Sequence, residues 1–243
     1  MGAHTLYLLH LGRLGGDPNL LDPVPGYVIR TASGRTILID TGHPTALIGA
    51  ATSDPWEPLD CEVHPEDDVA SRLAELDLAP ADIDLLISTH FDFDHCGRHD
   101  AFAAVGTESV VQRRHLAAAP MLPLIDPALW DLPGLRYTLL DGDTELEPGL
   151  RLLETPGHVP GHQSVYVETE SGPVILTIDA INREEEVSGD IIAEWYLDPN
   201  EGRRSRDQLL ALAAETNAFL LFGHDPVQWE TLPKSPAPFT GSV

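Results

Sequence analysis

The chain has 243 residues, of which 42% are hydrophobic and 22% charged, values that suit a globular α/β protein with a sizeable core. Its 39 acidic and 14 basic residues give a formal net charge of −25. Such a charge repels phosphate backbones, so the composition excludes a nucleic-acid-binding protein. The longest apolar runs, such as Ala218 to Phe222, are far too short to cross a membrane.

The N-terminus and the cysteines bear on the location of the protein. The first residues lack a basic segment followed by an apolar one, so we expect no secretory signal. Cys61 and Cys96 lie far apart and form no CxxC pair, so we expect no disulfide framework. Together these features predict a cytoplasmic protein.

Short apolar runs between turn residues predict a chain rich in strands. In the first part of the chain they cover Thr5–Leu11, Tyr27–Arg30, Arg35–Asp40 and Ile83–Ile87. A helix is expected to begin at Pro65, because acidic residues fill its first turn and Val69, Leu73 and Leu76 form an apolar stripe. The stretch from Ala51 to His64 is predicted to be a loop.

Further strands are expected at Ser109–Gln112, Tyr137–Leu140, Leu150–Leu153, Ser164–Val167, Val174–Ile178 and Ala218–Phe222. A helix is expected at Glu201–Glu215, and the proline-rich stretch from Pro120 to Gly134 is predicted to be a loop. Because no linker divides the chain, we expect residues 1–243 to form a single domain. Strands dominate and helices fall between groups of them, which favours two sheets with helices packed outside.

The strongest functional signal is Thr89-His90-Phe91-Asp92-Phe93-Asp94-His95-Cys96-Gly97, which directly follows an apolar strand. It holds four potential metal ligands within six residues. Imidazole nitrogens and carboxylate oxygens bind divalent ions such as zinc. A buried row of Asp and His would be costly to desolvate without a metal, and the two alternating phenylalanines argue against a merely solvated turn. The segment therefore predicts a metal site.

Three more segments place a ligand type at the end of a predicted strand. They are Thr155-Pro156-Gly157-His158-Val159-Pro160-Gly161-His162, Thr177-Ile178-Asp179-Ala180 and Phe222-Gly223-His224-Asp225. Because ligands at the ends of separate strands can gather at one edge of the sheets, we expect these segments to join the first one.

The order HxDxDH, TPGHxPGH, TIDA and FGHD resembles the metallo-β-lactamase superfamily, and the chain is most similar to its N-acyl-homoserine lactonase family. The resemblance covers nearly the whole chain and includes Leu38-Ile39-Asp40-Thr41-Gly42. It implies an αβ/βα sandwich of two mixed β-sheets flanked by helices. It also implies a quorum-quenching hydrolase that opens a lactone ring, with an N-acyl homoserine lactone as the first choice of substrate.

The resemblance further implies a centre of two divalent metal ions, zinc in the first instance, with iron, manganese or cobalt as alternatives. One ion would be held by His90, Asp92 and His158, the other by Asp94, His95 and His224, and Asp179 would bridge them. A hydroxide held by the ions would attack the carbonyl carbon, because coordination lowers the pKa of water.

Other residues receive roles from the same resemblance. Asp94 would also act as a catalytic acid that passes a proton to the leaving alkoxide. Phe93 and Asn182 would contact the substrate, and Asn182 would assist catalysis. Asp40 and His162 would support the metal ligands without binding an ion themselves.

The chain departs from the family pattern at Asp92, at Asn182 and after Gly97, where Arg98-His99 stands although a second glycine is common. The family usually has a histidine where Asp92 stands, and a third carboxylate makes the site less positive. We therefore expect a weaker Lewis acid that holds hard metals such as manganese or iron relatively better. Lactonases of this type commonly carry a tyrosine where Asn182 stands. The Asn182 amide can donate to an oxyanion, or the residue can merely serve a turn.

These departures keep alternatives open. The protein could hydrolyse another ester or a thioester, as glyoxalase II does, or could be an iron-dependent redox member of the superfamily. In each case the expected partner is a small molecule, which for the hydrolases is a lactone or an ester. We expect neither a nucleic acid nor a membrane as a partner. The sequence is compatible with a homodimer.

Overall fold

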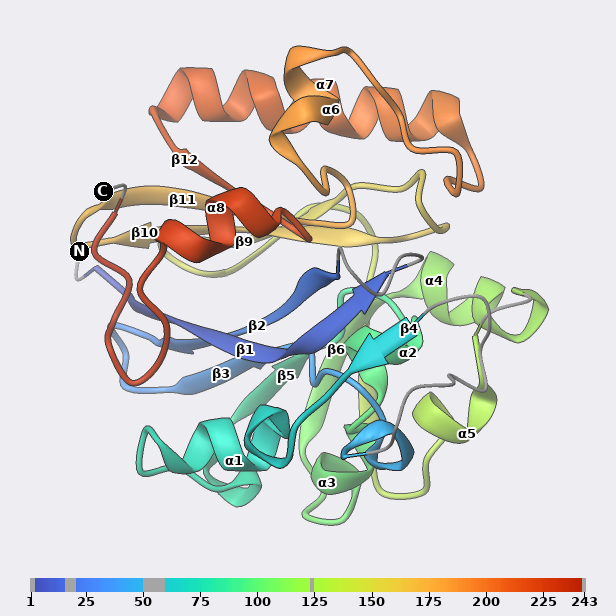
Figure 1. Ribbon diagram of the computed structural model, residues 1–243, viewed down its shortest axis with the longest axis vertical. Helices are drawn as coiled ribbons and strands as arrows, with labels where there is room; N and C mark the ends of the chain where they lie inside the picture. Colours follow the sequence, from blue (N-terminus) through green and yellow to red (C-terminus); the bar gives the residue numbers. More distant parts are fainter. Residues whose placement is uncertain (1–2, 16–20, 50–59, 123–124, 242–243) are drawn as a thin grey trace.

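The computed structural model describes residues 3–15, 21–49, 60–122 and 125–241, and in them two β-sheets pack face to face (Figure 1). Residues 51–59, most of the first predicted loop, lie outside the described residues. Among the described residues, no helix is both long and apolar enough to cross a membrane.

The first sheet has seven strands in the order β4-β1-β2-β3-β5-β6-β7. Their bounds are β1 Thr5–Gly15, β2 Asp22–Arg30, β3 Thr36–Ile39, β4 Asp60–Glu62, β5 Leu85–Ile87, β6 Glu108–Gln112 and β7 Arg136–Leu140. Strands β4, β1, β2 and β3 pair antiparallel, whereas β3, β5, β6 and β7 run parallel. The sheet is therefore mixed.

The second sheet has five strands in the order β12-β11-β10-β9-β8. Their bounds are β8 Thr144–Glu147, β9 Leu150–Glu154, β10 Gln163–Thr169, β11 Gly172–Ile178 and β12 Phe219–Phe222. Only β11 and β12 are parallel, and the other pairs are antiparallel. The predicted sandwich of two mixed sheets is confirmed.

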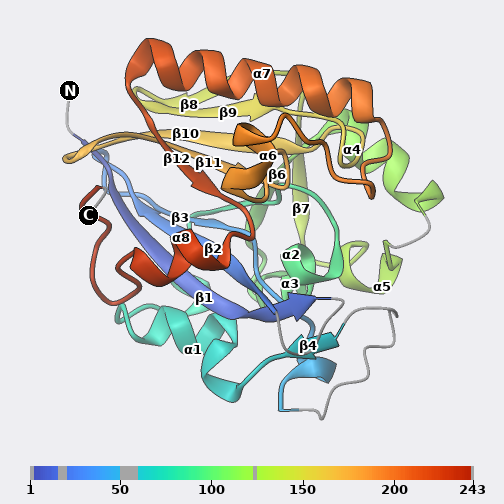
Figure 2. The same ribbon diagram turned by 45° about the horizontal axis from the view of Figure 1, so that its top comes forward.

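Helices lie on the outer faces of both sheets and along the edges of the sandwich (Figures 1 and 2). They are α1 Val69–Ala74, α2 Phe93–Cys96, α3 His99–Ala103, α4 Arg113–Ala118, α5 Pro127–Trp130, α6 Glu184–Ser188, α7 Pro199–Thr216 and α8 Pro226–Thr231. Single 3₁₀ turns lie at Thr45–Leu47, Pro65–Asp67, Pro80–Asp82 and Ala119–Met121. In Figure 1, α6 and α7 lie above the five-stranded sheet, and α1 and α3 lie below the seven-stranded sheet.

Strand alternation divides the core into layers, because successive side chains of a strand point to opposite faces. On β1, Leu6 and Leu8 pack between the sheets, whereas Leu9 and Leu11 pack on the outer face with Val69 and Leu73 of α1. Helix α7 covers the other outer face, where Leu209 packs with hydrophobic side chains of β9, β10 and β11. Each sheet thus buries both of its faces.

The long elements match the predicted ones, and the short elements were missed. Strand β4 lies in the first stretch predicted to be a loop, so that prediction was wrong at residues 60–62, and β8 and most of the one-turn helices had no prediction. Segments of three to six residues show too little periodicity for a sequence-based prediction. The predicted helix at Pro65 begins as a 3₁₀ turn, and α1 follows it. In the second predicted loop, α5 anchors Trp130, whose indole stacks at 5.0 Å on the Phe91 ring.

Candidate metal centre

The centre is built on the loop that leaves β5, and Asp40 at the end of the neighbouring β3 holds that loop. The Asp40 carboxylate is 1% exposed and accepts hydrogen bonds from the Thr89 backbone N–H at 2.9 Å and the Thr89 hydroxyl at 2.7 Å. Because the Thr89 hydroxyl donates to Asp40, it accepts from His90 Nδ1 at 3.0 Å. This chain of hydrogen bonds fixes the direction of the His90 ring.

Two of the other imidazoles are oriented in the same way. His95 Nδ1 donates to Asp40 Oδ2 at 2.9 Å, and His224 Nδ1 donates to the Pro23 carbonyl at 2.8 Å. With the proton on Nδ1, each Nε2 keeps its lone pair, which is the arrangement of metal-binding histidines. The Nε2 atoms of His90 and His95 are buried and meet no hydrogen-bond partner among the described residues.

The structure brings six of the seven predicted ligands together as two sets of donors that could each hold an ion, and Asp179 lies against both sets. In the first set, Asp92 Oδ2 lies 3.6 Å from His90 Nε2 and 3.0 Å from His158 Nε2. Asp179 Oδ2 closes the set, at 3.9 Å from His90 Nε2 and 3.5 Å from His158 Nε2.

The second set mirrors the first. Asp94 Oδ2 lies 3.3 Å from His95 Nε2 and 3.9 Å from His224 Nε2. Asp179 Oδ1 lies 3.3 Å from both of these nitrogens. The two oxygens of Asp179 therefore face different sets, which is the geometry of a bridging carboxylate.

The donor spacings fit a small divalent cation. Bonds of about 2.0–2.2 Å from a tetrahedral zinc ion to nitrogen or oxygen place its ligand atoms roughly 3.3–3.6 Å apart. The eight spacings run from 3.0 to 3.9 Å around that range. Each set offers two imidazoles, one carboxylate of its own and one oxygen of Asp179, so the donor chemistry fits as well.

The electrostatics also favour cations here. Burial alone would raise the pKa of Asp92, but His90 and His158 outweigh it and hold this pKa well below its usual range. Burial alone would lower the pKa of His224, but Asp179 and Asp94 raise it to about 9. Three carboxylates this close together need positive charge between them. Protons on the imidazoles supply that charge until a metal ion displaces them.

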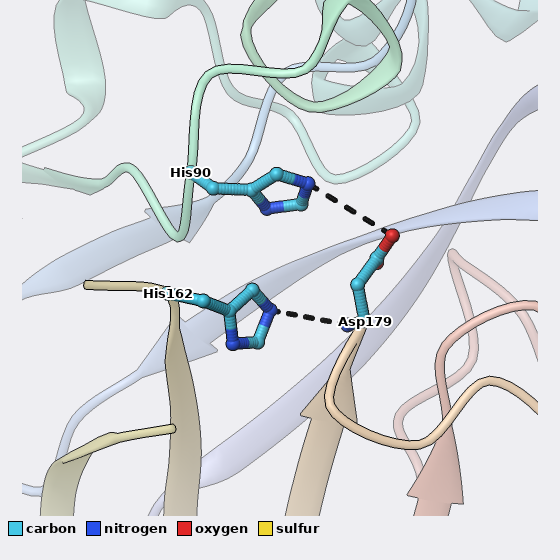
Figure 3. Close-up of side chains that lie close together, drawn as sticks. All are labelled: His90, His162 and Asp179. Carbon is cyan, nitrogen blue, oxygen red and sulfur yellow. Dashed lines mark hydrogen bonds and ion pairs between the residues drawn. The ribbon is translucent and has the colours of Figure 1, made fainter. Parts of the chain in front are cut away.

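His162 lies beside the ligands, as Figure 3 shows, but its metal-facing atom is already used. Its Nε2 accepts a hydrogen bond from the Asp179 backbone N–H at 3.2 Å, and its Nδ1 lies 2.9 Å from the Thr155 hydroxyl and 3.1 Å from the Thr155 carbonyl. Although His90, His162 and Asp179 lie close enough to form a third set of donors, these contacts make His162 a support for Asp179.

The two residues predicted to contact substrate are both buried. Phe93 is 7% exposed and packs with Leu47, Cys61 and Val63. Asn182 is 3% exposed, its backbone N–H donates to Glu186 Oε2 at 3.0 Å, and its carbonyl accepts from the His224 N–H at 3.0 Å. The Asn182 amide has no hydrogen-bond partner among the described residues.

Two residues of the site were missed in the sequence. Thr89 was read only as the start of its motif, although it joins Asp40 to His90. Tyr196 had no motif at all, yet its hydroxyl donates to the Asp179 carbonyl at 2.5 Å. A threonine next to a ligand histidine is a weak signal that can be searched for, whereas nothing in the sequence around Tyr196 points to Asp179.

Known proteins match this arrangement. An N-acyl homoserine lactonase of a Bacillus species is 36% identical over 213 residues, which cover 85% of this chain and 83% of that relative. The profile of the metallo-beta-lactamase superfamily matches residues 20–224. The chain belongs to the N-acyl homoserine lactonase family of this superfamily. The lactonase AiiA of Bacillus thuringiensis subsp. kurstaki is 34% identical over 209 residues, covering 84% of this chain and 81% of AiiA.

Solved lactonase structures superpose on nearly the whole fold. An N-acyl homoserine lactone hydrolase with N-hexanoyl-L-homoserine, its product, at the catalytic metal centre has a TM-score of 0.88 and 30% identity. The match covers 98% of this chain and 100% of that one. A B. thuringiensis AiiA variant with N-decanoyl-L-homoserine in its active site gives the same TM-score and identity. The family resemblance and the fold expected from the sequence are confirmed.

Proposed function

We propose that the protein opens the lactone ring of N-acyl homoserine lactones at a centre of two divalent metal ions. The observation that carries the proposal is the pair of matched donor sets that share Asp179, one oxygen to each set. It is supported by lactonase relatives whose solved structures hold N-acyl homoserine products. The ions would be held by His90, Asp92 and His158, by Asp94, His95 and His224, and by the bridging Asp179.

The chain's own residues would share the work around the ions. Bound ions would supply an activated water at neutral pH and polarise the lactone carbonyl. Asp94, buried beside His95 and His224, would pass a proton to the leaving alkoxide. Asn182 would donate to the carbonyl oxygen or bind the substrate amide. An unpaired buried amide costs about 1–3 kcal/mol, which favours a role that satisfies it.

The acyl chain of the substrate needs apolar surface near the centre. The segment after α6 offers it, because the side chains of Trp195 and Leu197 are exposed on either side of Tyr196. That segment adjoins the site, since the Leu197 N–H donates to the His158 carbonyl at 3.1 Å. We propose that the acyl chain lies against this segment and that Phe93 borders the lactone ring.

The proposal extends to metal and location. Zinc is the first choice, with manganese, iron or cobalt as alternatives, of which the additional carboxylate Asp92 favours manganese and iron. Both cysteines are buried thiols outside any disulfide, which suits a cytoplasmic protein. A homodimer is part of the proposal and can be checked by light scattering.

The test combines metal analysis with a substrate panel. Protein saturated in turn with zinc, manganese, iron and cobalt is assayed by pH drop on N-hexanoyl and N-decanoyl homoserine lactone, an alkyl γ-lactone and a thioester. We expect two ions per chain and the highest kcat/KM on the homoserine lactones. Asp179→Ala should abolish hydrolysis, whereas Asp141→Ala, at an exposed carboxylate paired with Arg113, should not. Efficient thioester hydrolysis without lactone hydrolysis would replace the proposal with the glyoxalase-like alternative.

A further inference from the structure

The backbone that carries the bridging carboxylate is strained. Ile178, directly before Asp179, has a φ of 51°, a left-handed conformation in which a β-branched residue is a true outlier. The parallel register between β11 and β12 also shifts between Leu176 and Ile178. Strain of this kind costs about 1–3 kcal/mol and persists only where surrounding contacts hold it.

Packing leaves little freedom around this turn. A Cβ added at Gly223 would lie 2.3 Å from the Ile178 carbonyl oxygen, so only glycine lets β12 end this close to β11. The Gly223 N–H donates to the Ile181 carbonyl at 3.1 Å. The residue after Ile178 is therefore turned out of the strand direction, toward the two donor sets.

Two hydrogen bonds hold the backbone of Asp179 itself. On one side its N–H donates to His162 Nε2 at 3.2 Å (Figure 3). On the other side its carbonyl accepts from the Tyr196 hydroxyl at 2.5 Å. The His162 contact comes from the TPGH segment, but the Tyr196 contact reaches across from the segment between α6 and α7.

Tyr196 is placed to hold more than one ligand. Its side chain is buried, and its hydroxyl donates to the Asp179 carbonyl. Its ring lies edge-on to the His158 imidazole, at 5.7 Å between centroids and 72° between planes. A Cβ at Gly202 would come within 2.5 Å of the Tyr196 ring, so the ring fits against α7 only because Gly202 has no side chain.

We propose that Tyr196 is a positioning residue that aims the bridging carboxylate of Asp179 between the two donor sets. It does so by holding the carbonyl of Asp179, the residue directly after the strained Ile178, while His162 holds the Asp179 N–H and the Tyr196 ring packs edge-on against His158. The inference rests on the metal centre proposed above, but not on the identity of the substrate. Supports of this kind typically change metal affinity about 10–100-fold when they are removed.

The experiment compares two tyrosines that make the same type of hydrogen bond. Tyr196→Phe removes the bond to the Asp179 carbonyl, and Tyr137→Phe removes a bond of 2.9 Å to the carbonyl of Trp130, which is not a proposed ligand. Zinc affinity is measured by competition with a chromogenic chelator, and unfolding is followed in urea. We expect both variants to lose similar stability, but only Tyr196→Phe to bind zinc about 10–100-fold more weakly.

A second variant tests the same residue without changing it. Gly202→Ala should displace the Tyr196 ring and reproduce the loss of zinc affinity, although alanine favours the helix. If both variants bind zinc within twofold of the parent, Tyr196 is only a structural residue and the inference is wrong. If the parent itself binds no metal, the proposed metal centre fails instead. Cobalt(II) spectra of parent and variants should report the changed coordination directly.

Discussion

Replacing Asp40 by asparagine should weaken metal binding although no ligand is touched. The Asp40 carboxylate accepts three hydrogen bonds, two from Thr89 and one from His95 Nδ1. Asparagine has one accepting oxygen and one donating NH₂ in the same space. If the NH₂ takes the Oδ2 position, it faces two donors, and if it takes the Oδ1 position, it faces the Thr89 N–H. In either orientation a donor meets a donor in a buried pocket.

The size of the expected loss in zinc affinity follows from these contacts. A hydrogen bond to a charged group contributes about 1.5–3 kcal/mol, and a buried donor left without an acceptor costs about 1–3 kcal/mol. The cheapest relief is a change of tautomer that moves the His95 proton to Nε2. That nitrogen then lacks the lone pair that faces Asp94 and Asp179. We therefore expect Asp40→Asn to lower zinc affinity about 10–100-fold, or roughly 1.4–2.7 kcal/mol.

A matched control separates this effect from general destabilisation. Asp67 is also buried and accepts hydrogen bonds from Arg72 and from the His64 N–H, but it contacts no proposed ligand. Asp67→Asn should therefore lose stability in urea and keep its zinc affinity. Chelator competition on both variants decides the matter. Parent-like zinc affinity in a folded Asp40→Asn variant would refute the tautomer reasoning.

Three further predictions concern the residues that distinguish this chain. Asp92→His should shift the relative affinity from manganese toward zinc in paired titrations. An Asp92→Ala variant that binds both ions as tightly as the parent would show that Asp92 is no ligand. Asn182→Ala should lower kcat on N-decanoyl homoserine lactone by less than the roughly 10²–10³-fold loss that is typical of one oxyanion donor. Asn182→Tyr should stay active. An unchanged kcat in Asn182→Ala would show that Asn182 takes no part in the mechanism. Burial, reinforced by Asp179 and opposed by the Asn182 N–H, raises the pKa of Glu186 to about 7. Stability should then be highest below the usual glutamate pKa and fall on the order of 3 kcal/mol as the pH rises through 7. Glu186→Gln should flatten this fall in urea titrations at several pH values, and an unchanged slope would contradict it.

The donor residues could be found in the sequence because metal ligands must be a few residue types and must sit where strands end. His90, Asp92, Asp94 and His95 share one short segment. The parallel strands β11 and β12 bring Asp179 and His224 to one edge, so the order of strands and motifs carries much of the site.

Other assignments depended on hydrogen-bond and packing partners that cannot be identified from the sequence. His158 and His162 stand four residues apart in one motif, and residue type alone permits both as ligands. The structure separates them, because His162 Nε2 already accepts the Asp179 N–H. Likewise Met121 and Trp130 belonged to one predicted loop, but Met121 is 78% exposed whereas Trp130 is buried against Phe91.

The sequence by itself predicted the two-sheet fold and the residues proposed as metal donors, because short apolar runs mark the strands and metal-binding residue types follow them. Its motifs resembled the family to which the chain belongs. Only the tertiary structure showed which oxygen of Asp179 faces which donor set, and that His162 and Tyr196 hold the Asp179 N–H and carbonyl. These features depend on the left-handed backbone of Ile178 and on contacts between segments far apart in the chain. Local sequence patterns do not predict such contacts, because the contacts form only when the two sheets pack together.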